Sequence, residues 1–204
     1  MNRREFLKGA MVSGAAAMVG GCATRGARGS GCGSMHGYHD QPLKELRIGL
    51  IGVSRGWAAM DFLLLPHCRI VAVCDVTEHR AKGAQKYIES KSGQPCAVYT
   101  GSEDYKRVCE RDDIDLIWNA TPWQLHVPVA LYAMEHGKHV ATEVPSAFTV
   151  DDCWELVETS ERTRRHCIQL ENCCYGEEEM LALNMVRQGL FGEIVHGEGA
   201  YIHD

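Results

Sequence analysis

The sequence predicts an α/β protein built on a doubly wound parallel sheet, followed by the beginning of a truncated α+β second domain. Three observations predict this class. Short apolar runs rich in β-branched residues alternate with longer stretches of helical character. A glycine-rich turn, Gly52 to Gly56, follows the first apolar run, and the second run ends on the acidic residue Asp75. Strands that are apolar throughout are typical of parallel sheets with helices on both faces.

The first elements form a βαβ unit. Residues 47–53 are a short apolar run that predicts the first strand, and residues 56–65 predict the helix after the glycine-rich turn. Residues 69–75 are continuously apolar up to their last residue and predict the second strand, while residues 78–90 have the spacing of a helix. A right-handed crossover would place these two strands side by side and parallel.

The following elements repeat this alternation four times. Ser102 is a plausible N-cap for one of the helices, and Gly137 is a helix stop signal. The further strands are expected at residues 97–99, 115–119, 139–142 and 167–171, and the helices between them at residues 102–111, 127–136 and 149–165. Six strands separated by helices predict a doubly wound sheet.

The pattern changes after Asn172. A helix is expected at residues 177–188 and an extended strand at residues 193–203. A lone strand cannot satisfy its own hydrogen bonds, so this strand is expected to belong to a second sheet that the chain does not contain. We therefore expect a nucleotide-binding domain at residues 46–172 and the incomplete start of a substrate domain at residues 173–204.

The overall composition restricts the function. The 204 residues are 45% hydrophobic and 24% charged, as in ordinary globular domains. The formal net charge is −6, and no basic stripe is present, so nucleic acid is not expected as a partner. No C-x-x-C motif occurs, and the adjacent Cys173 and Cys174 have no partner pair at zinc-site spacing, so we expect no metal site.

The N-terminus has the features of an export signal. Arg3 and Arg4 precede Phe-Leu-Lys and then a weakly apolar stretch, which resembles a twin-arginine signal over residues 1–21. Val-Gly-Gly-Cys22 is similar to a lipobox, so export to the periplasm, as a soluble or lipid-anchored protein, is expected. Residues 22–45 are predicted to form a flexible, glycine-rich linker.

The glycine-rich turn fits two motifs. Gly52-Val-Ser54-Arg-Gly56 is literally G-x-S-x-G, in which Ser54 would be the nucleophile of an α/β-hydrolase. It also fits a dinucleotide-binding turn at a helix N-terminus. Asp75, at the end of the second predicted strand, favours the second interpretation, because an acid about 20 residues after the turn accepts the ribose hydroxyls of NAD. The same carboxylate would repel the additional phosphate of NADP.

Two further motifs indicate a family. Asn119-Ala-Thr-Pro-Trp-Gln-Leu-His126 follows the fourth predicted strand, and Gly137-Lys-His-Val-Ala-Thr-Glu-Val-Pro145 contains the fifth. From Leu46 to Asp204 the sequence resembles the Gfo/Idh/MocA oxidoreductases. That resemblance implies a Rossmann domain that binds NAD, followed by an open antiparallel sheet that holds a sugar.

One departure refines the resemblance. Val144 stands where the sugar dehydrogenases of this family keep a lysine, and an isopropyl group is neither an acid nor a base. With Glu-Asn-Cys-Cys-Tyr175 and Glu-Gly-Ala-Tyr201-Ile-His-Asp, the sequence resembles glycoside hydrolase family 109, the NAD-dependent α-N-acetylgalactosaminidases. The implied substrate is a glycan with a terminal N-acetylgalactosamine.

The resemblance implies a mechanism other than two-carboxylate displacement. NAD would take a hydride from carbon 3 of the sugar, a base would remove the proton on carbon 2, and the aglycone would leave from carbon 1. Water would then add, and the hydride would return to carbon 3.

The resemblance also implies site residues. Tyr201 would be catalytic and would contact the substrate. The implied cofactor-binding residues are Arg55, Gly56, Asp75, Trp123, Gln124, Leu125, His126, Glu143, Val144 and Asn172. A plain NAD-dependent sugar oxidoreductase and a non-catalytic dinucleotide-binding module remain as alternatives. The sequence leaves open whether the chain forms a homo-oligomer and whether Cys22 carries a lipid.

Overall fold

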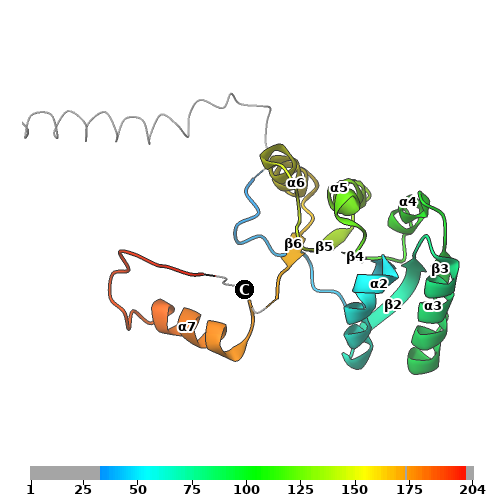
Figure 1. Ribbon diagram of the computed structural model, residues 1–204, viewed down its shortest axis with the longest axis horizontal. Helices are drawn as coiled ribbons and strands as arrows, with labels where there is room; N and C mark the ends of the chain where they lie inside the picture. Colours follow the sequence, from blue (N-terminus) through cyan, green and yellow to red (C-terminus); the bar gives the residue numbers. More distant parts are fainter. Residues whose placement is uncertain (1–32, 173, 201–204) are drawn as a thin grey trace, which may run out of the picture. The chain divides into compact units, whose positions relative to one another are not determined.

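A computed structural model describes residues 33–172 and 174–200 (Figure 1). The strands are β1 (Leu46–Ile51), β2 (Cys68–Cys74), β3 (Ala97–Tyr99), β4 (Leu116–Asn119), β5 (His139–Glu143) and β6 (Cys167–Leu170). The helices are α2 (Val53–Gly56), α3 (Glu78–Ser92), α4 (Asp104–Cys109), α5 (His126–Glu135), α6 (Val150–Thr163) and α7 (Glu177–Arg187), with 3₁₀ segments η1 (Trp57–Leu64) and η2 (Trp123–Leu125).

The six strands form one parallel sheet in the order β3-β2-β1-β4-β5-β6. The order reverses direction beside β1, which is the arrangement of a doubly wound sheet. Ligands bind such sheets outside the carboxyl ends of the strands at this reversal. The predicted fold class is confirmed, and it places the glycine-rich turn after β1 at the edge where a ligand is expected.

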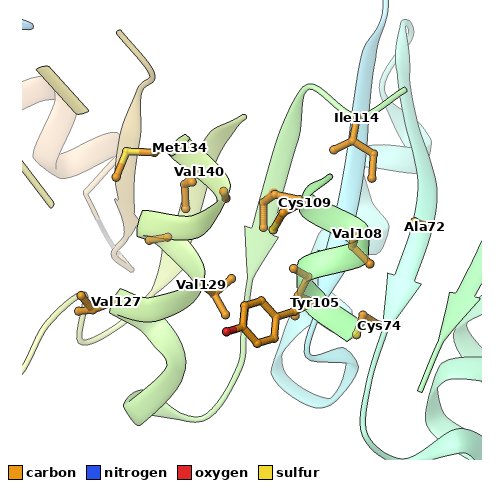
Figure 2. Packing of buried hydrophobic residues seen from close by; sticks show 14 of the residues in the cluster. Ala72, Cys74, Tyr105, Val108, Cys109, Ile114, Val127, Val129, Met134 and Val140 are labelled. Carbon is orange, nitrogen blue, oxygen red and sulfur yellow. The ribbon is translucent and has the colours of Figure 1, made fainter. Parts of the chain in front are cut away.

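Helices cover both faces of the sheet, and each face has its own core. Val108 of α4, Val129 of α5 and Leu156 of α6 pack on one face, in the cluster shown in Figure 2. Ala59 of η1 and Ile88 of α3 pack on the other. Because burial of apolar area is the main favourable contribution to folding, the two cores hold the strand ends in fixed positions.

Two predicted helices differ from those observed. The helix expected at residues 56–65 begins earlier, as α2, and continues as the 3₁₀ segment η1, because Gly56 has a ψ of 0° that interrupts the α-helical path. Ser102 is not an N-cap. The Asp104 carboxylate accepts hydrogen bonds from the Thr100 and Gly101 N–H groups, and α4 begins at Asp104.

The strand expected at residues 193–203 is also not observed, since residues 193–200 have no regular secondary structure. A strand requires a neighbouring strand, and the described residues offer none to this segment. Residues 201–204 lie outside the described residues. Within residues 33–172 and 174–200, no helix has both the length and the apolar character needed to cross a membrane.

Candidate functional site

A cavity of about 330 Å³ opens at the carboxyl ends of the strands, beside the reversal of strand order. Its wall comes from the segments that follow β1, β2, β3 and β4. The lining residues are Ile51, Gly52, Ser54, Arg55, Cys74, Asp75, Val76, Arg80, Gly101, Ser102, Tyr105, Ala120, Thr121, Pro122, Trp123 and Leu125.

Gly52 allows the turn after β1 to lie against the loop after β4. Its φ is +87°, and a Cβ atom there would be 2.2 Å from the carbonyl oxygen of Ala120. Only glycine combines this backbone conformation with such close contact. Gly56 has a different role, because a Cβ atom on it would be 2.5 Å from Cδ1 of Leu50. Gly56 therefore packs the turn onto β1 and does not line the cavity.

Asp75 directly follows β2, and its carboxylate accepts hydrogen bonds from the backbone. One carboxylate oxygen accepts a hydrogen bond from the Val53 N–H at 3.0 Å, and the other from the Thr77 N–H at 2.8 Å. Each oxygen has a second lone pair for a ligand hydroxyl. The carboxylate is thus fixed in place at the cavity wall, as recognition of a ribose requires.

The charged groups of the wall suit a dinucleotide. Asp75 is the only acid among the lining residues, and Arg55 and Arg80 are the two cations. Both arginines are exposed, and neither has an ion-pair partner among the described residues. Guanidinium groups form strong hydrogen bonds with phosphate oxygens. The wall therefore offers one acceptor for a ribose and two donors for a pyrophosphate.

The nucleophile-type side chains of this wall do not form a hydrolase site. Burial raises the pKa of the Cys74 thiol to about 12, so it stays protonated at neutral pH. Ser54 and His79 line a second cavity of about 320 Å³. No hydrogen bond joins Ser54 to His79 in the described part of the chain, so the Ser54 nucleophile hypothesis lacks its general base.

A buried polar network fixes the two loops next to this cavity. The His126 ring nitrogens lie 2.7 Å from the Pro145 carbonyl oxygen and 2.8 Å from that of Thr121. Asn119 donates hydrogen bonds to the His126 carbonyl oxygen at 2.9 Å and to Oγ1 of Thr142 at 3.2 Å. The network joins the loop after β4 to the loop after β5. Its hydrogen bonds are important for stability, because a buried polar group without a hydrogen-bond partner costs free energy.

The structure brings together some of the predicted site residues. Arg55, Asp75, Trp123 and Leu125 share the cavity wall. Outside this wall are Gly56, Gln124, His126, Glu143, Val144 and Asn172. His126 is only 1% exposed, Glu143 and Val144 are half-buried, and Asn172 is exposed. Tyr201 lies outside the described residues.

Sequence reasoning missed several lining residues. Arg80 lies in the first turn of α3, and Gly101, Ser102 and Tyr105 follow β3. The sequence feature that could have found them is that they follow strands at the ligand-binding edge of the sheet. This feature is not selective, because residues follow every strand of such a sheet at that edge. In the described part of the chain, no three His, Cys, Asp or Glu side chains are grouped as metal ligands.

The glycine turn, the fixed acid at the end of β2 and the reversal of strand order together define a dinucleotide-binding protein of the Rossmann type. Comparison with known families agrees. The model of the Gfo/Idh/MocA family, described as an oxidoreductase family with an NAD-binding Rossmann fold, matches residues 46–170. The chain belongs to this family.

Two further models match the remaining parts of the chain. Residues 175–204 match the C-terminal domain of glycosyl hydrolase 109. Residues 1–20 match a twin-arginine translocation signal, which confirms the predicted signal for export by that route.

Curated relatives are similar over most of this chain. A glycosyl hydrolase family 109 protein 1 of Bacteroides fragilis (strain YCH46) is 53% identical over 79% of the chain, which covers 36% of that relative. A Bacteroides fragilis protein named alpha-N-acetylgalactosaminidase is 48% identical over 82% of the chain, which covers 40% of it. The chain therefore spans little more than a third of the length of the curated relatives that it matches.

Solved structures share the fold. A scyllo-inositol dehydrogenase from Lactobacillus casei with bound NAD(H) and scyllo-inositol has a TM-score of 0.64 and 21% identity, over 74% of this chain and 43% of that one. The WlbA dehydrogenase from Chromobacterium violaceum, in complex with NADH and UDP-GlcNAcA, has a TM-score of 0.62 and 21% identity, over 73% of this chain and 41% of that one. These similarities show the Rossmann fold, and the family model that matches residues 46–170 describes it as NAD-binding.

Proposed function

We propose that the protein containing this chain is an NAD-dependent glycosidase that releases terminal α-linked N-acetylgalactosamine from glycans. The observation that carries the proposal is Val144, which follows β5 where a dehydrogenase of this family would need an ionisable side chain. The relative named alpha-N-acetylgalactosaminidase supports the same substrate.

The chain's own residues have separate tasks in this proposal. Asp75 holds the adenosine ribose, and Arg55 and Arg80 hold the pyrophosphate. Glu143 at the end of β5, Val144 directly after it and Asn172 after β6 would contact the nicotinamide end of the cofactor. His126 acts indirectly, by positioning the loop that carries Val144 and Pro145, because its ring lies within hydrogen-bond distance of the Pro145 carbonyl oxygen. Tyr201, outside the described residues, contacts the sugar and moves a proton.

Bound NAD supplies reversible hydride transfer, which makes the proton beside the oxidised carbon acidic enough to remove. The protein must then orient the sugar and exclude water until the aglycone has left. The exposed Trp123 and Phe148 rings, with centroids 6.1 Å apart, lie on the loops after β4 and β5 and can shield this end of the site. Because such a cycle would return the hydride to the sugar, it would consume no NAD, which suits export to a compartment without a supply of it.

The deciding experiment uses the natural protein that contains this sequence. It is incubated with a nitrophenyl α-N-acetylgalactosaminide in deuterated water, and both aglycone release and deuterium at carbon 2 of the released sugar are recorded. We expect release with deuterium incorporated, because the proton on carbon 2 is removed and replaced during each turnover.

The alternative function gives a different result. A plain NAD-dependent sugar oxidoreductase would accumulate NADH with free sugars and release no aglycone. Aglycone release without deuterium would still indicate a glycosidase but would contradict the elimination route.

Periplasmic localisation with a lipid on Cys22 is also part of the proposal. Metabolic labelling with a fatty acid, compared between the natural protein and Cys22→Ala, tests it.

A further inference from the structure

A second cavity, of about 320 Å³, adjoins the cofactor cavity and has no task in the proposed reaction. It opens between α3 and the segment formed by α2 and η1, which contact each other (green and cyan in Figure 1). Ser54 and Arg80 line both cavities, whereas Trp57, His79 and Gly83 line only the second. The second cavity is therefore accessible to a ligand when the first holds NAD.

Trp57 offers an aromatic surface to this cavity. The residue is 46% exposed, and its ring packs on that of Tyr87 in α3, with the two centroids 5.2 Å apart. The Lys91 ammonium lies 5.7 Å from the centroid of the Tyr87 ring. The C–H groups on one face of a sugar ring are attracted to the negative face of an aromatic ring. An exposed tryptophan that a neighbouring ring supports is therefore suited to a sugar.

The polar side chains around the cavity favour an anion. No acid is among its lining residues, which include Arg80, His79 and the Ser54 hydroxyl. Lys86 lies three residues after Gly83 on α3, which places it near the same face of the helix. Among the described residues, no ion pair involves Arg80, His79 or Lys86. On a chain with a formal net charge of −6, this local positive charge attracts an anionic ligand.

Gly83 keeps one wall of the cavity open. It lies inside α3, where a glycine is less favourable than an alanine. Nothing in the described chain lies within 4 Å of a Cβ atom built on Gly83, so no packing contact requires a glycine there. A glycine inside a helix without a packing reason indicates that the space beside the helix backbone has a use.

We propose that this second cavity binds an acidic sugar of a glycan, with the sugar ring on Trp57 and its carboxylate or sulfate group towards His79 and Arg80. The Arg80 guanidinium has several N–H donors, so it can contact both this anion and the pyrophosphate. The site retains an acidic glycan at the enzyme and takes no part in the cleavage. It rests on the proposed function only in that its ligand is a glycan.

The test is saturation-transfer NMR on the natural protein that contains this sequence, with NAD in excess so that the cofactor cavity is filled. The acidic probes are the methyl α-glycoside of N-acetylneuraminic acid, which carries a carboxylate, and a sulfate ester of methyl β-galactoside. Unmodified methyl β-galactoside is the neutral comparison. None of the three contains N-acetylgalactosamine, so none is a substrate of the proposed glycosidase.

We expect at least one acidic probe to bind at least about tenfold more tightly than methyl β-galactoside, because hydrogen bonds to a charged group are strong. Tighter binding of the carboxylated or of the sulfated probe supports the proposal and identifies the anion. Acidic probes that bind no more tightly than the neutral sugar, or that displace NAD, would overturn it.

Two variants locate the binding. Trp57→Ala should weaken binding of the acidic probe at least about tenfold, because the aromatic surface is lost. Gly83→Leu should abolish binding without lowering the unfolding temperature, because leucine fills the cavity and is the better helix former. Trp154→Ala on α6, where the tryptophan is also 46% exposed, is the control and should leave binding unchanged.

These variants also separate the second cavity from the proposed reaction. Aglycone release from the nitrophenyl α-N-acetylgalactosaminide should be the same in Trp57→Ala and Gly83→Leu as in the natural protein. Unchanged probe binding in either variant would overturn the acidic-sugar site and leave the proposed function intact. Absence of aglycone release in the natural protein would contradict the proposed function, whatever the probes show.

Discussion

At the scale of single residues, we propose that Asp75 decides which cofactor the cavity accepts. Asp75→Ala should weaken NAD binding by about 10–100-fold, because hydrogen bonds to a charged group contribute about 1.5–3 kcal/mol. The difference between NAD and NADP affinity should also narrow, since the carboxylate no longer repels the additional phosphate. Isothermal titration with both cofactors measures this. Asp112→Ala, at an exposed site away from the cavity, is the control. Equal weakening of both cofactors would indicate only a loop-holding role.

Gly52 should be the least replaceable residue of the turn after β1. Gly52→Ala should destabilise the chain by at least about 2 kcal/mol, since it combines an unfavourable φ with a Cβ atom 2.2 Å from the Ala120 carbonyl oxygen. Gly137→Ala is the matched control, with a φ of +78° and open space around the Cβ position, and should cost about 1 kcal/mol. Urea unfolding compares them, and equal losses would show that the close contact is unimportant.

How far single site residues could be predicted depends on what specifies them. Asp75 and Arg55 were predicted because a glycine-rich turn and an acid after the next strand are local signals. Arg80 was missed, because its place at the cavity depends on the path of α3. His126 is buried, with both ring nitrogens next to backbone carbonyl oxygens, and its contact with the cofactor stays a prediction. Motif matching finds such a residue but does not reveal which neighbour it serves.

At the scale of elements, α6 begins with a capping box, directly after the loop that follows β5. Oγ1 of Thr149 accepts the Asp152 N–H, and the Asp152 carboxylate accepts the Thr149 N–H, both at 3.1 Å. Thr149→Ala should therefore lower the free energy of unfolding by about 1 kcal/mol. Thr77→Ala, at the N-cap of α3 where no side-chain cap bond is made, should change it less. Thermal unfolding of the two variants tests this, and equal losses would contradict the role of the box.

The elements that sequence reasoning predicted best are the strands. All six strands of the sheet were predicted, including β3 and β6 at its edges, because short apolar runs between helical stretches have few alternatives. The errors fall where a distant partner or a short-range hydrogen bond decides. Residues 193–200 lack a neighbouring strand in the described chain, and the start of α4 is set by the Asp104 carboxylate.

At the scale of the whole molecule, ionisation of His139, the first residue of β5, links stability to pH. Burial, together with the nearby Arg165 cation, lowers the pKa of His139 below its ordinary 6.5, while Asp40 opposes this and His166 adds to it. The folded chain thus binds fewer protons than the unfolded chain. The contribution of His139 to stability is complete above pH 6.5 and is lost as the pH falls through its lowered pKa.

A second loss of stability should follow at lower pH. The Arg47 guanidinium, through its hydrogen bonds, lowers the pKa of Asp115 below 3.8, and Arg111 does the same for Asp113. Both contributions are present above 3.8 and disappear as these carboxylates take up protons.

We therefore expect the unfolding temperature to fall in two stages on acidification, first below about pH 6.5 and again below about pH 3.8. His139→Gln should remove the first stage and leave the second, because only the first depends on an imidazole. Differential scanning calorimetry between pH 3 and pH 8 distinguishes the stages. If His139→Gln retains the first stage, another histidine carries it.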